Sequence, residues 1–374
     1  MHEFFKKNHD IIIIAVFAAF LAVFSLMDVI LPDRETSEME NRELAKFPEF
    51  SVSELVSGRF ATNYEEYISD QFILRDFWID IKSRAETLLG KTENNGIVYG
   101  RDGYMFEKYY SADERRMMNN TSFINRFCER YGADTTLAIV PNSYMILSDK
   151  LPRGLENLDQ TPYIGRVYSA LEGASGLWLN GALSEHADEY IYYRTDHHYT
   201  TYGAYIVYCE YMRSIGLEPV SLDALTAHDV EGFYGTHYSK TKLYSAQPDT
   251  ITWYEIPGKT VEIDNKPADG IYDLEKFGER DKYAAFLHGN HSLTVIRSEQ
   301  ESDDPTRILL IKDSFGNELA PFLACSFDEV YIVDPRYTSV PVSSFMEEVE
   351  FDEVLILYNF MNFAADTNVI NITQ

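Results

Sequence analysis

The chain has 374 residues, of which 45% are hydrophobic and 25% charged, so it is long enough for a large core and is not a disordered protein. Its 60 acidic residues outnumber its 32 lysines and arginines, and the net charge of −28 argues against nucleic acid as a partner. The three cysteines form no C-x-x-C pattern, so the sequence indicates neither a zinc site nor a disulfide framework.

The N-terminal segment predicts a membrane anchor. Residues 11–27 are uncharged and strongly apolar, a run just long enough to span a bilayer as a helix. Lys6 and Lys7 precede this run and acidic residues follow it, so the positive-inside tendency places the N-terminus in the cytoplasm and the remainder outside the cell. A cleaved signal peptide is the alternative. We predict a single-pass protein of the cell membrane, with residues 1–31 as cytoplasmic tip and anchor.

The remainder is predicted to form a stalk over residues 32–50 and a catalytic ectodomain over 51–374. Residues 51–90 carry apolar side chains at helical spacing, and residues 97–106 indicate two short strands around an Asp-Gly turn. Residues 217–305 contain short β-like runs and many turn residues, so we interpret them as an insertion beside the active site. Further elements are expected as helices near 121–131, 163–171 and 200–216, and as strands over 135–141 and 176–179.

Three buried strands are expected near the C-terminus, over residues 307–311, 329–333 and 353–358. Helical or loop spacers separate them, which favours β-α-β units and a parallel sheet. Each strand is followed by polar residues, where open α/β sheets bind their ligands: Asp313-Ser314, Asp334-Pro335-Arg336 and Asn359.

Two distant segments supply the parts of a serine-based active site. Ser314 offers a hydroxyl, and the segment from Thr195 to Tyr199 contains Asp196 and His198. A serine needs an imidazole to take its proton, and a carboxylate fixes the tautomer of that imidazole. In an irregular turn Asp196 and His198 can face one site, with His197 pointing away.

Further side chains could complete this site. A serine that opens a helix is close to helix-terminal N–H groups, which can stabilise an oxyanion, and Asn359 could add a side-chain donor. Arg336 could contact substrate or its carbonyl group. Other interpretations stay open at this point, because Ser314 could be a helix N-cap, Asp196 and His198 a structural or zinc-binding pair, and Arg336 part of a surface ion pair.

The order of these motifs resembles the SGNH hydrolase superfamily, where an Asp-Ser motif precedes an oxyanion Asn. There an Asp-x-x-His motif usually closes the chain, whereas here the tighter pair Asp196–His198 comes before Ser314. This departure is similar to the permuted branch found in the alginate O-acetylation proteins and especially in the bacterial DHHW family, with Tyr199 in place of the family's Trp. Supporting motifs are Glu40-Asn41-Arg42 with Phe47-Pro48, Gly100-Arg101-Asp102-Gly103-Tyr104, and Asp313-Ser314-Phe315 with Pro321-Phe322-Leu323.

The resemblance implies an α/β, SGNH-like (flavodoxin-like three-layer) fold and acyl chemistry on an extracellular polysaccharide. Ser314 would be the nucleophile, His198 the base and Asp196 the orienting carboxylate, with Asn359, Arg336 and Tyr199 as oxyanion or substrate contacts. The enzyme would be an O-acetyltransferase or acetylesterase that needs no cofactor or metal. A separate membrane-bound acyltransferase would bring the acetyl groups.

Two other functions are open from the sequence. One is a non-catalytic, membrane-tethered glycan-binding or scaffolding protein of exopolysaccharide assembly, in which Ser314 lies beyond hydrogen-bond reach of His198. The other is a metal-dependent hydrolase that uses His197 and His198.

Overall fold

The computed structural model describes residues 2–300, 302–337 and 341–373. In the first helix the side chains of residues 2–8 and 29 are not described, so Lys6 and Lys7, on which the predicted orientation rests, lie outside the described side chains. The chain forms two compact units, one of residues 1–91 with 242–244 and one of residues 92–241 with 245–374. This boundary differs from the predicted start of the catalytic part at residue 51.

The first unit contains the apolar N-terminal helix and a small helical module. Helix α1 (His2–Ile30) includes the segment His9–Asp28, which is long and apolar enough to cross a membrane and is not buried by the rest of the chain. The other elements are β1 (Thr36–Ser37), β2 (Arg42–Glu43), α2 (Val52–Val56), α3 (Arg59–Gln71) and α4 (Arg75–Leu88). The helices α2 to α4 confirm the predicted helical region.

The predicted stalk is folded onto this module rather than extended. Arg42, in the second strand of the β1–β2 pair, donates two hydrogen bonds to the buried carboxylate of Asp70 on α3, at 2.7 and 2.5 Å. Paired, forked contacts between guanidinium and carboxylate are among the stronger hydrogen bonds in proteins. They explain why the acidic segment around Arg42 is ordered.

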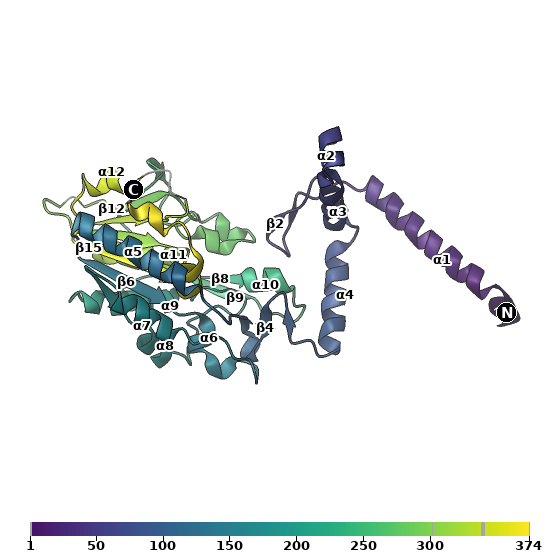
Figure 1. The fold of residues 1–374 in the computed structure, drawn as a ribbon, viewed down its shortest axis with the longest axis horizontal. Coiled ribbons are helices and arrows are strands. Elements are labelled where there is room, and N and C mark those ends of the chain that lie inside the picture. Colours follow the sequence, from purple (N-terminus) through teal and green to yellow (C-terminus); the bar gives the residue numbers. More distant parts are fainter. Residues whose placement is uncertain (1, 301, 338–340, 374) are drawn as a thin grey trace. The chain divides into compact units, whose positions relative to one another are not determined.

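The second unit is built on an eight-stranded sheet in the order β11-β10-β12-β14-β13-β15-β6-β7 (Figure 1). Neighbours from β14 through β13, β15 and β6 to β7 are parallel, whereas β12, β10 and β11 are added antiparallel. The strands are β6 (Thr135–Val140), β7 (Ala174–Leu177), β10 (Lys259–Ile263), β11 (Lys266–Ala268), β12 (Leu293–Ser298), β13 (Arg307–Lys312), β14 (Glu329–Val333) and β15 (Glu353–Asn359).

The three predicted C-terminal strands are therefore confirmed as β13, β14 and β15, but the sheet is mixed rather than purely parallel. The antiparallel strands all come from residues 217–305. The predicted insertion does contain β-strands, and three of them, β10, β11 and β12, extend the central sheet. In these antiparallel strands apolar and polar residues alternate, because one face of each strand is partly exposed. Their sequences therefore indicate a strand less clearly than the continuous apolar runs of the parallel strands do.

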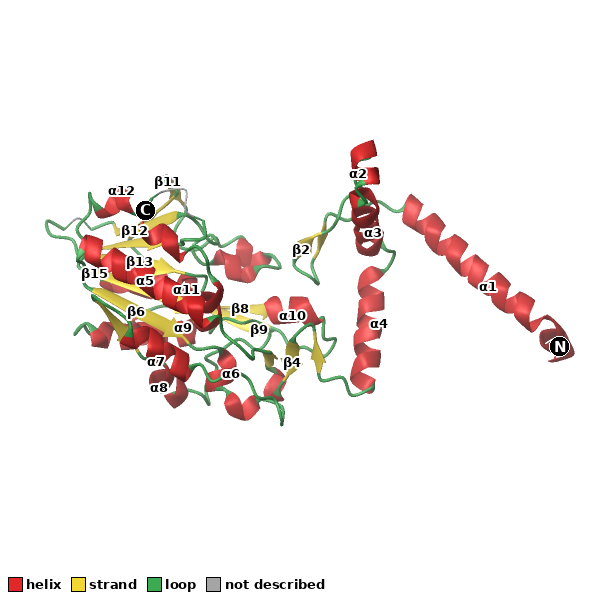
Figure 2. Cartoon of the chain, in the orientation of Figure 1, coloured by secondary structure: helices red, strands yellow, loops and turns green. Residues whose placement is uncertain are grey.

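Two hydrophobic clusters lie on opposite faces of the sheet, as β13 shows. Ile308 and Leu310 belong to one cluster, and Leu309 and Ile311 to the other, because successive side chains of a strand point to opposite faces. Figure 2 shows red helices on both sides of the yellow sheet. The helices are α5 (Glu114–Tyr131), α6 (Ser143–Ile146), α7 (Thr161–Ser169), α8 (Asn180–Glu185), α9 (Thr201–Ser214), α10 (Thr236–Thr241), α11 (Gly316–Ser326), α12 (Ser343–Met346) and α13 (Phe360–Ala365).

Smaller elements surround this three-layer core. The predicted hairpin is confirmed as β4 (Ile97–Tyr99) and β5 (Met105–Glu107), joined to β3 (Glu93–Asn94), and its turn residues Asp102 and Gly103 have positive φ. A second hairpin pairs β8 (Ala227–Phe233) with β9 (Asp249–Tyr254). Helix α5 begins seven residues before the predicted start because Asp113 caps it by accepting the backbone N–H of Arg116. All three cysteines are free thiols.

Candidate active site

The loop before α9 carries the aspartate and histidines, and a buried carboxylate holds it in place. Asp249, the first residue of β9, accepts the backbone N–H of Thr195 at 2.8 Å and its hydroxyl at 2.6 Å. The Thr195 hydroxyl oxygen in turn accepts the backbone N–H of Gly235. The loop is thereby fixed to two segments of the insertion.

Asp196 is almost fully buried and accepts three hydrogen bonds. Its Oδ1 lies 2.6 Å from Nδ1 of His198 and accepts the backbone N–H of His198, and its Oδ2 accepts the backbone N–H of Thr236 at 2.6 Å. Burial alone would raise the pKa of Asp196, but the nearby charges of His197 and His198 and the bond to His198 hold it well below its usual value. This carboxylate therefore stays ionised and keeps the His198 proton on Nδ1.

Ser314 follows β13 and precedes the first turn of α11, at the carboxyl edge of the sheet. Its Oγ lies 2.8 Å from Nε2 of His198, although 116 residues separate the two. The fully buried Asp313 shapes this turn, since it accepts the backbone N–H groups of Phe315 and Asn359 and the side-chain amide of Asn362. The structure thus brings Asp196, His198 and Ser314 into one hydrogen-bonded chain.

Aromatic rings surround the His198 imidazole. The ring of His197 lies 3.9 Å from it and that of Tyr283 lies 4.0 Å from it, measured between centroids, and Phe315 lies 4.7 Å away. The prediction that His197 points away is wrong. The hydroxyl of Thr236, 2.7 Å from Nδ1 of His197, fixes that ring against its neighbour instead.

The environment of His198 gives a testable pH dependence. Burial, and then the charge of His197, lower the pKa of His198 to about 4, against the opposing effect of Asp196. The role predicted for His198 from the sequence, that of a general base, requires the neutral imidazole. That prediction implies that kcat/KM for an aryl acetate stays level from neutral pH to about pH 5 and falls as the pH approaches the pKa. An acid limb near the ordinary histidine pKa, about 6.5, would contradict this assignment.

The same titration requires a control for folding. The unfolded chain binds a proton at His198 below about pH 6.5, whereas the folded chain does not until the pH reaches the lower folded value. This group therefore lowers the free energy of unfolding as the pH falls through that window. Intrinsic fluorescence recorded at each pH separates loss of activity from loss of fold.

Comparison with known proteins identifies the family of the chain. The family model described as DHHW protein matches residues 92–333, which is more than half of the chain. The chain belongs to the DHHW family. A search of curated proteins gave no match.

Solved structures similar to this DHHW protein cover about three quarters of the chain. A DHHW family protein from Eubacterium siraeum has 26% identity and a TM-score of 0.65, covering 75% of this chain and 95% of the other. Bacillus cereus PatB1 with a sulfonyl adduct has 19% identity and a TM-score of 0.60, covering 74% of this chain and 98% of the other. The O-acetyltransferase domain of Pseudomonas putida AlgJ has 14% identity and a TM-score of 0.45, covering 72% of this chain and 93% of the other.

In this DHHW protein Tyr199 and Asn359 lie in the core. Tyr199 is 0% exposed and donates its hydroxyl to the carbonyl oxygen of Phe315, so it supports the backbone after the serine and does not face a substrate. The amide of Asn359 donates to the carbonyl oxygen of Val140, and its Oδ1 accepts the backbone N–H of Met361. The Asn359 amide has a second N–H group besides the one that donates to Val140, and an oxyanion role for it stays a prediction.

Arg336 is half-buried and held in one orientation. Its Nε and Nη2 donate to the two carboxylate oxygens of the fully buried Asp334, at 2.8 and 2.6 Å. This pairing keeps the pKa of Arg336 above its usual value against the opposing effect of burial. The ion pair that we considered from the sequence is therefore present, and a substrate contact by the remaining N–H groups stays a prediction.

The sequence reasoning missed the contacts of four residues of the insertion with Ser314 or with the loop that carries Asp196 and His198. These residues are Asp249, Gly235, Thr236 and Tyr283. Single residues in a stretch without periodicity give no signal of their own. The ligand atoms of Asp196, His197 and His198 lie within 4.8 Å of one another, a spacing that a metal could bridge. A metal there would have to break the direct bond between Asp196 and His198.

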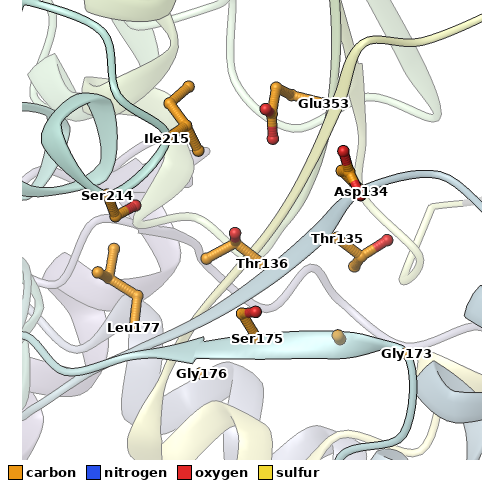
Figure 3. A pocket seen from close by; sticks show the side chains of 11 residues that line it. Asp134, Thr135, Thr136, Gly173, Ser175, Gly176, Leu177, Ser214, Ile215 and Glu353 are labelled. Atoms are coloured by element: carbon orange, nitrogen blue, oxygen red, sulfur yellow. The ribbon is translucent and has the colours of Figure 1, made fainter.

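A pocket of about 460 Å³ lies at the opposite edge of the sheet (Figure 3). Thr135 and Thr136 at the start of β6, Ser175 on β7 and Glu353 at the start of β15 line it. Because β6, β15 and β13 are parallel, their first residues lie at the end of the sheet far from Ser314. This pocket therefore does not belong to the candidate active site.

Proposed function

We propose that this protein is a serine-dependent acyl-transfer enzyme, an O-acetyltransferase or acetylesterase that acts on a cell-surface or exported polysaccharide. The observation that carries the proposal is the continuous chain from Asp196 through His198 to Ser314, with contacts of 2.6 and 2.8 Å. A scaffolding role for a degenerate triad would leave the serine beyond reach of the imidazole. Family membership supports the same chemistry.

In the first half of the reaction, Ser314 becomes acylated. Its Oγ attacks the carbonyl carbon of the acetyl donor as its proton passes to Nε2 of His198, and Asp196 stabilises the imidazolium. The tetrahedral intermediate collapses, His198 returns the proton to the leaving oxygen, and an acetyl ester on Ser314 remains. The backbone N–H of Ser314, at the start of α11, is the proposed donor to the oxyanion.

In the second half, a hydroxyl group attacks the acetyl-Ser314 ester. The hydroxyl gives its proton to His198 as it bonds to the acetyl carbon, and His198 then returns the proton to Ser314 as the ester breaks. A sugar hydroxyl gives an O-acetylated glycan, and water gives acetate. The same side chains serve both outcomes, so access of the acceptor decides between transferase and esterase.

The proposed setting is the outer face of the cell membrane, with α1 as an uncleaved anchor. The exposed, apolar segment His9–Asp28 supports it. A membrane-bound acyltransferase is the proposed source of acetyl groups, and a polysaccharide is the proposed acceptor. The net charge of −28 favours a neutral or locally paired glycan over a strongly acidic one.

The acyl-enzyme provides the direct test. Incubation of the protein with an activated aryl acetate is expected to add one acetyl group, and peptide mapping should place it on Ser314. Addition of candidate glycans should speed its loss if the enzyme is a transferase. Because PatB1 is known with a sulfonyl adduct, a sulfonyl fluoride should also label Ser314.

Ser314→Ala is the matched control and should take up neither group while keeping the thermal midpoint within a few degrees. Unchanged labelling of that variant would exclude the mechanism. Activity that a chelator abolishes and zinc restores would favour the metal-dependent alternative.

The anchor gives a separate prediction. We expect the full chain to stay in the membrane fraction after an alkaline carbonate wash, with its N-terminal residues still present by mass. External protease should remove the catalytic part from intact cells. Release of a protein that begins after residue 31 would instead identify α1 as a cleaved signal sequence.

A further inference from the structure

The insertion places one aromatic side chain directly on the candidate catalytic pair. Tyr283 lies on a short 3₁₀ turn, Lys282–Ala285, and is 8% exposed. Its ring is nearly parallel to the His198 imidazole, with 4.0 Å between centroids and 12° between planes. Its hydroxyl donates to the carbonyl oxygen of Ser314 at 2.8 Å. One side chain thus contacts both the base and the backbone of the nucleophile.

The turn that carries Tyr283 is itself fixed. The backbone N–H of Asp273 donates to the carbonyl of Ala285, and that of Leu287 donates to Ile271. Phe286 and Leu287 are buried in the hydrophobic cluster on this face of the sheet. The Tyr283 ring is therefore held by the core rather than by a mobile loop.

The two rings on His198 restrict how it can turn. His197 and Tyr283 each lie about 4 Å from the same imidazole, and two rings at that distance cannot share one face. They therefore enclose the imidazole from opposite sides. Rotation about the bond to the ring would drive it into either neighbour, so Nε2 stays directed at Ser314 and Nδ1 at Asp196.

We propose that Tyr283 is a positioning residue, by which the insertion holds the imidazole of His198 and the backbone of Ser314 in the geometry for proton transfer. This inference rests on the proposed function and adds to it a required role for the insertion. The aromatic face of Tyr283 also stabilises the positive charge that His198 gains when it takes the serine proton. The hydroxyl and the ring make separable contributions.

Two variants separate these contributions. Tyr283→Phe keeps the ring and removes one hydrogen bond, so kcat for an aryl acetate should fall by about 2- to 10-fold. Tyr283→Leu removes the ring as well, and a misplaced imidazole should lower kcat on the order of 10²-fold. KM should change little in both, because neither variant alters the contacts of a small substrate.

Tyr272 offers a matched control within the insertion. It is also 8% exposed, and its hydroxyl donates to the carbonyl of Tyr254, but its ring packs against Phe286 rather than on the triad. Tyr272→Leu should cost stability as Tyr283→Leu does, and kcat should stay within about 2-fold of the original protein. If Tyr283→Leu does not fold, a series of fluorinated phenylalanines at 283 keeps the shape and weakens the charge on the ring face.

A readout that does not depend on activity distinguishes this inference from the proposed function. The short bond between Asp196 and His198 should give a low-field Nδ1–H proton resonance, assigned by its loss in His198→Gln. We expect it in the original protein, in Tyr283→Phe and in the fluorinated variants, which all keep the ring, and expect it broadened or absent in Tyr283→Leu. A resonance and kcat unchanged in Tyr283→Leu would overturn the positioning role. If that variant does not fold, an unchanged kcat across the fluorinated series would overturn the contribution of the ring. If Ser314 takes up no acetyl group while the resonance follows this pattern, the proposed function fails and the positioning role stands.

Discussion

Replacing His198 by alanine is expected to lower the rate of Ser314 acetylation on the order of 10⁴- to 10⁶-fold. Without the imidazole, the serine proton has no acceptor within hydrogen-bond distance in the observed triad, and the ionised Asp196 is separated from Oγ by the space that the ring fills. The measurement is the rate of acetyl uptake by mass, with the fold checked by thermal melting. A loss below about 100-fold would mean that another group takes the proton.

His197→Ala is the matched control for this prediction. It removes the same ring from the adjacent position, but the His197 ring is hydrogen-bonded to Thr236 rather than to Ser314. We expect the acetylation rate to fall by no more than about 10²-fold, far less than in His198→Ala, since the base stays and one of the two rings that hold it is lost. An equally large loss of acetylation rate in His197→Ala and His198→Ala would mean that both histidines are needed to take the serine proton.

The second large effect is expected at Gly235. The backbone of Gly235 and Thr236 runs against the buried Asp196, and a Cβ at position 235 would overlap both the Cβ and Oδ2 of that residue. Gly235→Ala must therefore push the carboxylate away from His198. We expect kcat to fall on the order of 10²-fold and the free energy of unfolding to fall by about 1–3 kcal/mol.

Gly181→Ala tests whether that effect is local. Gly181 lies in α8, and a Cβ there meets nothing within 4 Å. Alanine in a helix should leave kcat unchanged and raise the free energy of unfolding by up to about 1 kcal/mol. Full activity in Gly235→Ala, with its chemical denaturation curve also unchanged, would show that Asp196 tolerates displacement.

The parallel strands and the triad could be predicted from the sequence because each produces a local signal. Strand β13 contains the apolar run of residues 308–311, which Lys312-Asp313-Ser314 follows, and the Asp-His-His segment precedes a helix that Thr200 caps. The two segments also occur in the order that is found in the DHHW family. The position of Ser314 at the carboxyl edge of the sheet then follows from the rule that open α/β sheets bind ligands there.

The rest of the site depends on contacts that no local pattern encodes. Asp249 looks like an ordinary strand-end acid until the fold buries it against Thr195, and Tyr283 is one of 27 tyrosines. The buried position of Tyr199 follows from the neighbouring Phe315, which lies 116 residues away. Likewise, strands β10 to β12 join the central sheet only through pairing of β12 with β14.

The strand order determines when the central sheet can close during synthesis of the chain. The last strand, β15, is not at an edge of the sheet. It lies between β6 and β13 and pairs with both of them. Until residue 359 has emerged, two apolar strands therefore expose unpaired backbone, a state in which strands readily associate with other chains. The central sheet can therefore close only after β15 has been synthesised, and we expect a chain truncated ahead of Glu353 to aggregate rather than to fold.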